Sequence, residues 1–331
     1  MQSEVIMSSR GEFGFIDFIK IHFKTPNGAT GIGDDCAVLP EGCLNDTTDN
    51  NDLLVSTDML MEGVHFLRDK SSPEDIGWKA AAVNLSDIAA MGGSPVATFL
   101  SIALPKDAQE DWAERFIKGY AEISSLYDVP LLGGDTTSSL RDLAINVCIL
   151  GRCPSGKALM RSGARVGDLI YVTGPLGDSA GGLQAILDKI ETTDHVEKLI
   201  SIHKRPVPRI TEGLKLRNSG MVGAMMDISD GIASDLRHIL KASGVGATVE
   251  LDKLPLSEEL KAVCQEQNWD MYKLATGGGE DFELLFTGRP ELASHLDFPI
   301  YPIGRIIAES GLHWQFNGKQ TDFENHGYKH F

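Results

Sequence analysis

Apolar positions along the chain recur with two periods, one typical of helices and one typical of strands. Residues 11–23 place apolar side chains near helical spacing, which predicts an amphipathic first helix. Ser72-Pro73-Glu74-Asp75 combines a capping serine, a proline at the first helical position and acids in the first turn, so a second helix is expected to begin there. This helix should end near Met91, because Gly92-Gly93 follows.

One more helix and several strands are expected before residue 152. A helix over 107–126 should turn five side chains inward, namely Trp112, Phe116, Ile117, Tyr120 and Ile123. Short apolar runs predict strands at 53–55, 95–104 and 143–150, and residues 129–132 lead into Gly133-Gly134-Asp135-Thr136-Thr137. Residues 151–156 are expected to form a turn after which the pattern changes.

The second half repeats a simple order of strand, loop and helix. Strands are expected at residues 169–173, 222–226, 247–251, 282–287 and 301–307. Helices are expected at 183–190, 196–202, 210–219, 232–242 and 257–265, with one more near Glu291. We place a domain boundary near residue 152, which divides the chain into domains 1–152 and 153–331 of a mixed α+β fold.

Carboxylates recur among Ser, Thr and Gly beside these apolar runs. The segments are Gly31–Asp35, Ser56–Asp58, Ser86–Asp87, Gly133–Asp135, Asp227–Asp230 and Gly277–Asp281. Each alone could be a helix cap or a turn, for which Asp and Ser are preferred. Together they indicate loops that converge on one site, where a bound cation would offset the repulsion between neighbouring acids. Such oxygen sets suit hard cations such as Mg²⁺ and not zinc.

Composition narrows the classes of partner. The chain has 331 residues and is 42% hydrophobic, which is enough for two domains. Its formal net charge of -17 makes binding to nucleic acid unlikely on electrostatic grounds. An acidic protein can still bind a phosphorylated substrate if metal cations supply the missing positive charge.

Membrane and secretory signals are absent from the sequence pattern. No run approaches the ~20 apolar residues that a membrane span needs, and residues 1–10 do not resemble a signal peptide. We therefore expect a cytoplasmic protein that binds no membrane. The five cysteines share no Cys-x-x-Cys spacing, so they are expected to be reduced thiols.

Three glycine-rich segments resemble phosphate-binding motifs to different degrees. Residues 151–158 match a P-loop except at the last position, where Ala158 has no hydroxyl for a metal. Gly31-Ile32-Gly33 falls one glycine short of the dinucleotide fingerprint. Residues 174–182 lie between an expected strand and an expected helix, and could either bind phosphate through backbone N–H groups or form a turn that permits close packing.

Three further residues leave a structural and a functional interpretation open. His65 could end a short strand or belong to a site, and Arg161 could be a surface turn residue or a phosphate clamp. Tyr328 lies in the aromatic tail and could anchor the C-terminus or stack on a ring.

The motifs taken together resemble the thiamine-monophosphate kinase family. The segments that carry the resemblance are Gly33–Ala37, Ser56–Asp58, His65–Phe66, Val83–Gly92, Gly133–Thr137, Arg161–Ala164, Asp227–Gly231, Gly278–Asp281 and the terminal Gly327-Tyr328-Lys329-His330-Phe331. The family belongs to the superfamily of aminoimidazole ribonucleotide synthetase. The resemblance implies a PurM-like fold in which an N-terminal sheet domain forms a homodimer and a C-terminal α/β domain follows.

The implied activity is ATP-dependent phosphorylation of thiamine monophosphate to thiamine diphosphate with several Mg²⁺ ions and no phosphoenzyme. The implied metal ligands are Asp35, Ser56, Thr57, Asp58, Asp87, Asp135, Asp227 and Asp230. The implied ATP contacts are Gly134, Asp135, Arg161 and Ser229, and the implied substrate contacts are His65, Glu280 and Tyr328. No general base is expected to be essential, since the attacking phosphate oxygen is already largely ionised. Asp34 is expected to support Asp35 or to form the turn.

Two other classes of function remain as alternatives. One is another enzyme of the same superfamily, such as aminoimidazole ribonucleotide synthetase or selenophosphate synthetase. Selenophosphate synthetases carry a reactive Cys or selenocysteine near the N-terminus, and residues 1–30 contain neither. The other is a non-catalytic sensor that binds a nucleotide with Mg²⁺. Turnover of ATP with thiamine monophosphate separates the sensor from the kinase.

Overall fold

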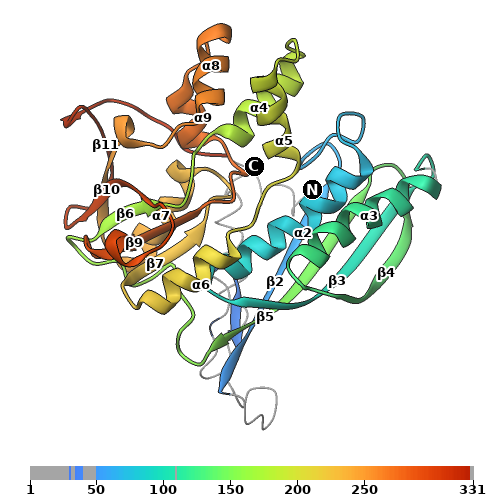
Figure 1. The fold of residues 1–331 in the computed structure, drawn as a ribbon, viewed down its shortest axis with the longest axis horizontal. Helices are drawn as coiled ribbons and strands as arrows, with labels where there is room; N and C mark the ends of the chain where they lie inside the picture. Colours follow the sequence, from blue (N-terminus) through green and yellow to red (C-terminus); the bar gives the residue numbers. More distant parts are fainter. Residues whose placement is uncertain (1–29, 31–33, 40–49, 109, 329–331) are drawn as a thin grey trace, which may run out of the picture.

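The protein has two halves, each built around one β-sheet (Figure 1). The structure is a computed structural model, and it describes residues 30, 34–39, 50–108 and 110–328. The helix expected at 11–23 lies outside the described residues. None of the described helices is both long enough and apolar enough to cross a membrane.

The first sheet has five strands in the order β1-β2-β5-β3-β4. Their bounds are β1 Ala37–Leu39, β2 Asn51–Met61, β3 Ser94–Pro105, β4 Leu131–Ser139 and β5 Ala144–Pro154. β5 pairs antiparallel with β2 and with β3, whereas β4 joins β3 in parallel. Two helices pack beside this sheet, α2 (Pro73–Ala90) and α3 (Glu110–Leu126), and Figure 1 shows them running across it.

Three strands differ from the sequence-based expectation because pairing with neighbours extends them. β2 does not end at residues 56–58 but continues to Met61, paired with β5 along its whole length. Gly133–Thr137 are part of strand β4, because their backbone groups pair with β3. β5 continues to Pro154, so the turn expected at 151–156 begins later. The division into domains at residue 152 stays a prediction.

Helix α2 begins where the sequence predicts and lies between the two halves. Ser72 Oγ accepts a hydrogen bond from the Asp75 N–H at 3.1 Å, as a capping serine should. The helix is buried on most sides, and small residues allow its neighbours to approach closely. A Cβ added at Gly119 of α3 would lie 1.9 Å from the Glu74 carbonyl oxygen. Because α2 contacts both sheets, it can carry side chains from the first half into a site in the second half.

The second sheet has seven strands in the order β12-β11-β8-β10-β6-β9-β7. Their bounds are β6 Leu169–Val172, β7 Val222–Asp227, β8 Gly246–Glu250, β9 Leu284–Gly288, β10 Tyr301–Ile307, β11 Gly311–Phe316 and β12 Lys319–Gln320. The helices are α4 Asp178–Asp188, α5 Asp194–Lys204, α6 Ile210–Ser219, α7 Ile232–Ser243, α8 Glu258–Gln267 and α9 Met271–Gly277. Two short 3₁₀ turns, Leu251–Lys253 and Leu292–His295, complete the half. The expected α+β class is confirmed.

The glycine-rich segment 174–182 permits close packing. Helix α4 begins at Asp178, five residues before the expected start at Leu183. The Asp281 carboxylate accepts hydrogen bonds from the Gly177 and Ser179 N–H groups, so an acid of the chain already occupies this helix end. A Cβ added at Gly182 would lie 2.3 Å from the Leu199 carbonyl oxygen of α5. These contacts favour the packing interpretation over a phosphate-binding loop.

The inward face of α3 is predicted correctly except at one position. Phe116, Tyr120 and Ile123 are buried, and Trp112 packs partly against the same core. Ile117 is 44% exposed, so its expected burial is wrong. It lines an open groove between α3 and the strands β3 and β4.

Candidate functional site

An acid-lined cavity of about 500 Å³ lies where β2, α2 and the loop after β7 meet, and we call it the acidic cavity. Its polar lining comes from Asp34, Asp35, Ser56, Thr57, Asp58, Asp87, Arg161, Asp227 and Ser229. β2 and α2 hold the side chains from the first half, and β7 with its following loop holds those from the second. Residues far apart in the sequence therefore form one site.

Three carboxylates converge closely enough to share one cation. One oxygen from each of Asp35, Asp87 and Asp227 lies within 4.8 Å of the others. Ser56 Oγ donates a hydrogen bond to Asp87, and Ser86 Oγ donates to Asp227 at 2.5 Å. The two serines fix the orientations of the acids, so the carboxylates are pre-arranged around a common point.

Burial and mutual repulsion destabilise the charged forms of these acids. Burial raises the pKa of Asp227 to about 8, and the charge of Asp35 adds to the effect. Burial raises the pKa of Asp58 to about 6, again with a contribution from Asp35. The pKa of Asp87 lies well above its usual range, first through burial and then through Asp58. A cluster of this kind lacks positive charge, and its oxygen ligands suit Mg²⁺.

Arg161 provides one cation beside the cluster. Its guanidinium donates to both oxygens of Asp35, from Nη2 to Oδ1 at 3.0 Å and from Nε to Oδ2 at 3.3 Å. The backbone N–H of Arg161 donates to Asp34 Oδ1 at 2.7 Å. Asp34 thus positions the arginine, while Asp35 faces the acids. The two neighbouring acids therefore make different contacts, and the role of Asp35 as a metal ligand stays a prediction.

A second cavity of about 460 Å³ adjoins the first, and we call it the adjoining cavity. Asp58, Val83, Ser229 and Phe282 line both cavities. The predicted substrate contacts His65, Glu280 and Tyr328 all line the adjoining cavity, together with Asp230. The remaining lining is largely apolar and includes Met59, Val64, Leu183, Leu187 and Leu274. The chemistry suits a ring system with a few polar groups.

Glu280 in the adjoining cavity has a cationic partner, as Asp35 has in the acidic cavity. Lys79 Nζ lies 2.7 Å from Glu280 Oε2, and His203 Nδ1 lies 3.4 Å from the same oxygen. Burial acts to raise the pKa of Glu280, but the charge of Lys79 and its hydrogen bond act in the other direction, and the pKa lies below its usual value. Glu280 is therefore a carboxylate held in its charged form.

Two predicted ATP contacts do not reach either cavity within one chain. Gly134 and Asp135 lie on the edge strand β4, where they line a separate hollow of about 350 Å³ beside α3. Across the sheet, Asp58 pairs with Val147, Val147 with Leu100 and Leu100 with Gly134, so Gly134 lies three strands away from Asp58. At about 4.8 Å between strands, this separation is roughly 14 Å.

Sequence reasoning missed the residues that surround Glu280. Lys79, His203 and Ser179 belong to no recognised motif. The signal for Lys79 is a lysine inside the apolar run Trp78 to Ala82, because a charged residue there must find a partner when the helix is buried. His203 and Ser179 carry no comparable signal.

Comparison with known proteins agrees with this geometry. The family model described as AIR synthase related protein, N-terminal domain, matches residues 33–153, and the corresponding C-terminal domain model matches residues 165–287. The chain is 40% identical to the thiamine-monophosphate kinase of Salmonella typhimurium over 97% of this chain and 98% of that protein.

Solved structures show the same similarity over nearly the full length. A structure described as AaThiL complexed with AMPPCP and TMP is 36% identical, with a TM-score of 0.86 and 98% of each chain covered. The thiamine-monophosphate kinase of Stenotrophomonas maltophilia is 38% identical, with a TM-score of 0.75 over 94% of this chain and 98% of that one. The expected PurM-like fold is confirmed, and the chain belongs to the thiamine-monophosphate kinase family.

Proposed function

We propose that this protein phosphorylates thiamine monophosphate to thiamine diphosphate with ATP as the phosphoryl donor. The observation that carries the proposal is the pair of adjoining cavities, one acidic and one largely apolar, which share Asp58 and Ser229. Two phosphorylated substrates can meet at this shared wall, where in-line transfer requires the phosphates to be close and aligned. Relatives that carry the name of this kinase support the same conclusion.

Magnesium fits the oxygen-rich acidic cavity. Its ligands would be Asp35, Ser56, Thr57, Asp58, Asp87 and Asp227, with Asp230 from the adjoining wall and, in a dimer, Asp135 from β4 of the other protomer. Mg²⁺ supplies positive charge that offsets the repulsion between two phosphorylated substrates. The convergence of three buried carboxylates, with Arg161 as the neighbouring cation, supports this assignment.

The chain itself binds and orients the two substrates. Arg161 and Ser229, with Gly134 and Asp135, contact ATP, and the planar guanidinium suits phosphate oxygens. His65, Glu280 and Tyr328 hold thiamine monophosphate in the adjoining cavity. No side chain has to remove a proton from the nucleophile, because a phosphate monoester with a second pKa near ~6 is largely ionised at neutral pH. We place this reaction in the cytoplasm.

A homodimer explains the position of Gly134 and Asp135. β1 pairs with only the first part of β2, at Leu53–Val55, so among the described residues no strand covers the outer edge of β2 from Ser56 to Met61. The outer edge of β4 is likewise uncovered in the described sheet. Unpaired edges favour association. In a two-fold dimer, β4 of one protomer can lie beside β2 of its partner and bring Asp135 to the partner's Asp58.

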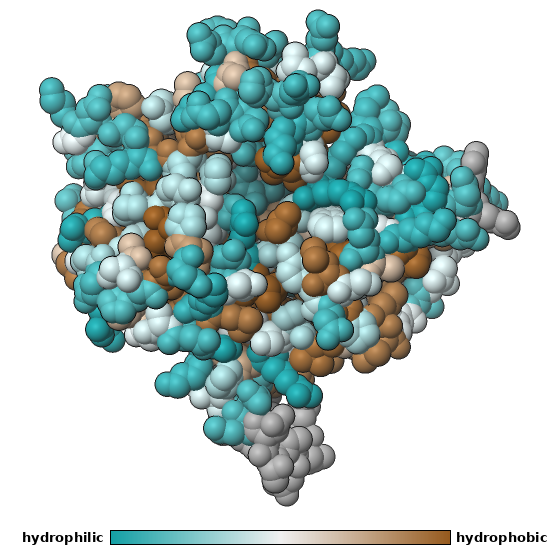
Figure 2. All heavy atoms as spheres, viewed as in Figure 1, coloured by the Kyte–Doolittle hydropathy of each residue, from teal (hydrophilic) through white to brown (hydrophobic). Residues whose placement is uncertain are grey.

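Exposed apolar side chains on the first sheet support the same interface. Leu132 on β4 is 65% exposed, Met59 on β2 is 57% exposed and Phe99 on β3 is 37% exposed. Figure 2 shows further apolar surface along the part of the molecule formed by α3, β3 and β4. Large exposed side chains of this kind mark association surfaces.

Product analysis tests the reaction. Purified protein, ATP, thiamine monophosphate and Mg²⁺ are expected to form one thiamine diphosphate for each ADP, measured by chromatography. ATP hydrolysis without thiamine diphosphate would contradict the proposal. Addition of EDTA is expected to stop the reaction, and unchanged turnover in EDTA would contradict the magnesium assignment.

Mixed dimers test the shared site. Asp58→Asn and Asp135→Asn should each inactivate the homodimer, because every site needs both acids. After subunit exchange, half of the dimers are mixed and one of their two sites is intact, so about a quarter of the wild-type activity should return. If both acids act within one chain, no activity returns. Light scattering of the wild type should report two chains for each particle.

A further inference from the structure

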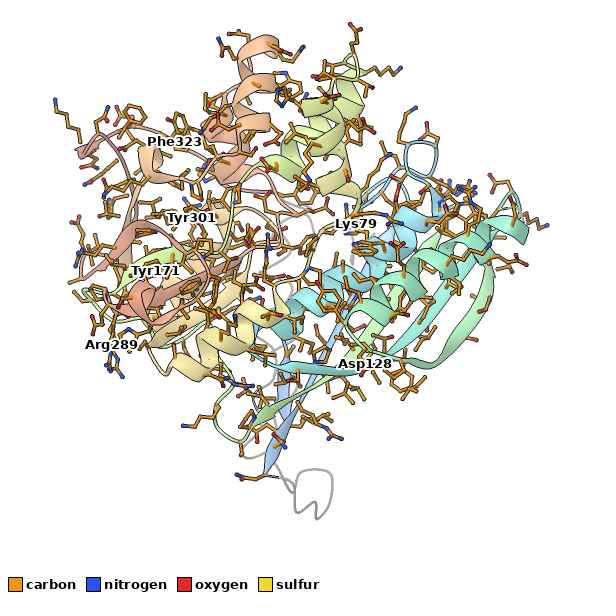
Figure 3. The ribbon with its side chains drawn as sticks, in the orientation of Figure 1. Lys79, Asp128, Tyr171, Arg289, Tyr301 and Phe323 are labelled. Atoms are coloured by element: carbon orange, nitrogen blue, oxygen red, sulfur yellow. The ribbon has the colours of Figure 1, made fainter. Side chains whose placement is uncertain are left out.

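A lysine is buried at the boundary between the two halves. Lys79 lies on α2, and its side chain is 4% exposed. Figure 3 labels Lys79 where α2 passes between the two halves. Its Nζ donates to Glu280 Oε2 at 2.7 Å and to the His65 carbonyl oxygen at 3.5 Å. Because a buried ammonium is costly to desolvate, these acceptors and the lysine fix one another.

Both acceptors belong to residues that line the adjoining cavity. Glu280 has a φ of +64°, in the left-handed region that non-glycine residues rarely adopt. Its backbone N–H donates to the Ser229 carbonyl oxygen at 2.8 Å, which holds the turn. A conformation of this kind persists only where its surroundings determine it. The backbone places Glu280 at the cavity wall, and Lys79 fixes its side chain.

Of the two side chains beside Glu280 Oε2, Lys79 and not His203 balances the charge of the carboxylate. His203 Nδ1 lies 3.4 Å from Glu280 Oε2 and 3.0 Å from Ser179 Oγ. Burial, followed by the charge of Lys79, lowers the pKa of His203 to about 4, so this ring is neutral at pH 7. The ion pair crosses from the first half to the second.

One oxygen of the carboxylate is left for a ligand. Among the described residues, none donates a hydrogen bond to Glu280 Oε1, whereas Oε2 accepts from Lys79. The Glu280 side chain is 26% exposed and lines the adjoining cavity. A carboxylate held at one oxygen and open at the other can accept from a donor in a defined direction.

We propose that Lys79 is a positioning residue, which holds the Glu280 carboxylate in the orientation that binds the thiamine moiety and so sets the affinity for thiamine monophosphate but not for ATP. The inference rests on the proposed function and adds a residue that touches neither substrate. Thiamine carries an amino group that donates hydrogen bonds and a permanently cationic ring, and an oriented carboxylate recognises both. The triphosphate of ATP is an anion and gains nothing from Glu280.

A double-mutant cycle tests the inference with Lys79→Met, Glu280→Gln and the double variant. Lys79→Met is expected to raise the KM for thiamine monophosphate at least tenfold and to change the KM for ATP less than twofold. In the Glu280→Gln background, the same replacement should change the KM for thiamine monophosphate less than twofold, because the carboxylate that Lys79 positions is gone. Lys79→Arg keeps the charge and should recover part of the lost affinity.

Two comparisons keep the test decisive. If Lys79→Met does not fold, Lys79→Arg, which keeps a cation beside Glu280, takes its place in the cycle, and a smaller rise in the KM for thiamine monophosphate with an unchanged KM for ATP is then expected. The matched control is Lys215→Met, which breaks an exposed ion pair with Asp297 of the same 2.7 Å length. Both KM values should stay unchanged in this control.

Additive effects of the two substitutions, or equal changes in both KM values, would overturn the role of Lys79 and leave the proposed function standing. A wild-type protein that forms no thiamine diphosphate would contradict the proposed function instead. In that case, calorimetric titration of thiamine monophosphate into the wild type, the two single variants and the double variant decides the role of Lys79. A wild type that does not bind thiamine monophosphate would overturn both the role of Lys79 and the proposed function.

Discussion

The two cavities differ in how their acids are balanced. In the adjoining cavity, Glu280 is paired with Lys79 inside the protein, and the charge is settled before any ligand binds. In the acidic cavity, Asp58, Asp87 and Asp227 crowd together, with Arg161 bound to Asp35 alone among the four acids that converge there. Burial raises the pKa of a carboxyl that has no cationic partner, whereas a cationic partner opposes that rise.

This difference indicates which cavity needs a metal. The acidic cavity costs the folded protein energy until cations or protons neutralise it, whereas the Glu280 carboxylate of the adjoining cavity already has a cationic partner in Lys79. We therefore propose that cations bind with the triphosphate in the acidic cavity and that the organic ring binds in the adjoining cavity. Carboxylates therefore have different roles in the two cavities, and the charges of their neighbours decide which role each one has.

The largest expected effect is that of Asp58→Asn, at the wall shared by both cavities. The amide keeps the shape but removes a charge, so the fold should remain while kcat falls about a thousandfold, as expected when a group that acts on developing charge is lost. Circular dichroism should match the wild type. Full activity at saturating Mg²⁺ would refute the metal role, and Asp297→Asn, on the exposed surface, serves as the control.

The next effect concerns pH and tests the charge imbalance itself. The pKa of Asp227 is raised to about 8 and that of Asp58 to about 6, so without metal the folded chain retains protons that the unfolded chain has lost. These acids should therefore destabilise the metal-free fold as pH rises from about 4 to 8. Mg²⁺ must displace those protons when it binds. For each proton that it displaces, the affinity of the protein for Mg²⁺ falls by up to about tenfold for each pH unit by which the pH is lowered.

Thermal unfolding with and without Mg²⁺ measures this effect. The gain in melting temperature on adding Mg²⁺ should be large at pH 8 and small at pH 5.5. Asp227→Asn should reduce the difference between the two pH values. An equal gain at both pH values would show that the acids are not protonated in the metal-free protein.

A smaller effect is expected at the open end of the adjoining cavity. Tyr328 is 46% exposed, and its backbone N–H donates to the Asp230 carbonyl oxygen at 2.9 Å, so the main chain holds it at the wall. Tyr328→Ala should raise the KM for thiamine monophosphate about tenfold, in line with the loss of a ring contact of ~1.4 kcal/mol. The KM for ATP should change less than twofold, and equal changes would refute ring contact.

The smallest effect separates the two neighbouring acids at the start of the site. Asp34 accepts a hydrogen bond from the Arg161 backbone N–H, and an asparagine at this position keeps the accepting oxygen. Asp34→Asn should therefore lower kcat/KM less than about threefold. Asp35→Asn should lower it far more, because it removes the charge that faces Arg161 and the acid cluster. Similar losses for both variants would contradict the division of roles.

The sequence predicted the elements whose signals are local. The start of α2 follows from Ser72 and Pro73, and most strands of the second half follow from short apolar runs. The convergence of Asp35, Asp87 and Asp227 also follows from repeated motifs that end or follow strands. These features depend on residue type and spacing, which the sequence contains.

Features that depend on distant partners could not be predicted. Gly133–Asp135 were expected in a loop after a strand, but β3 supplies the hydrogen bonds that make them part of a strand. Ile117 fits the apolar face of its helix, yet the described part of the chain leaves it 44% exposed. The partner of Lys79 lies 201 residues away in the sequence, and no local pattern connects it to Glu280.

The central claim is that the acidic cavity takes the cations and the adjoining cavity takes the organic substrate. Crystals grown with Mn²⁺ in place of Mg²⁺, a non-hydrolysable ATP analogue and thiamine monophosphate test it through anomalous scattering. The account predicts anomalous peaks among the oxygens of Asp35, Asp87 and Asp227, with none beside Glu280. Peaks at Glu280, or an acid cluster without a peak in crystals that contain both ligands, would contradict it.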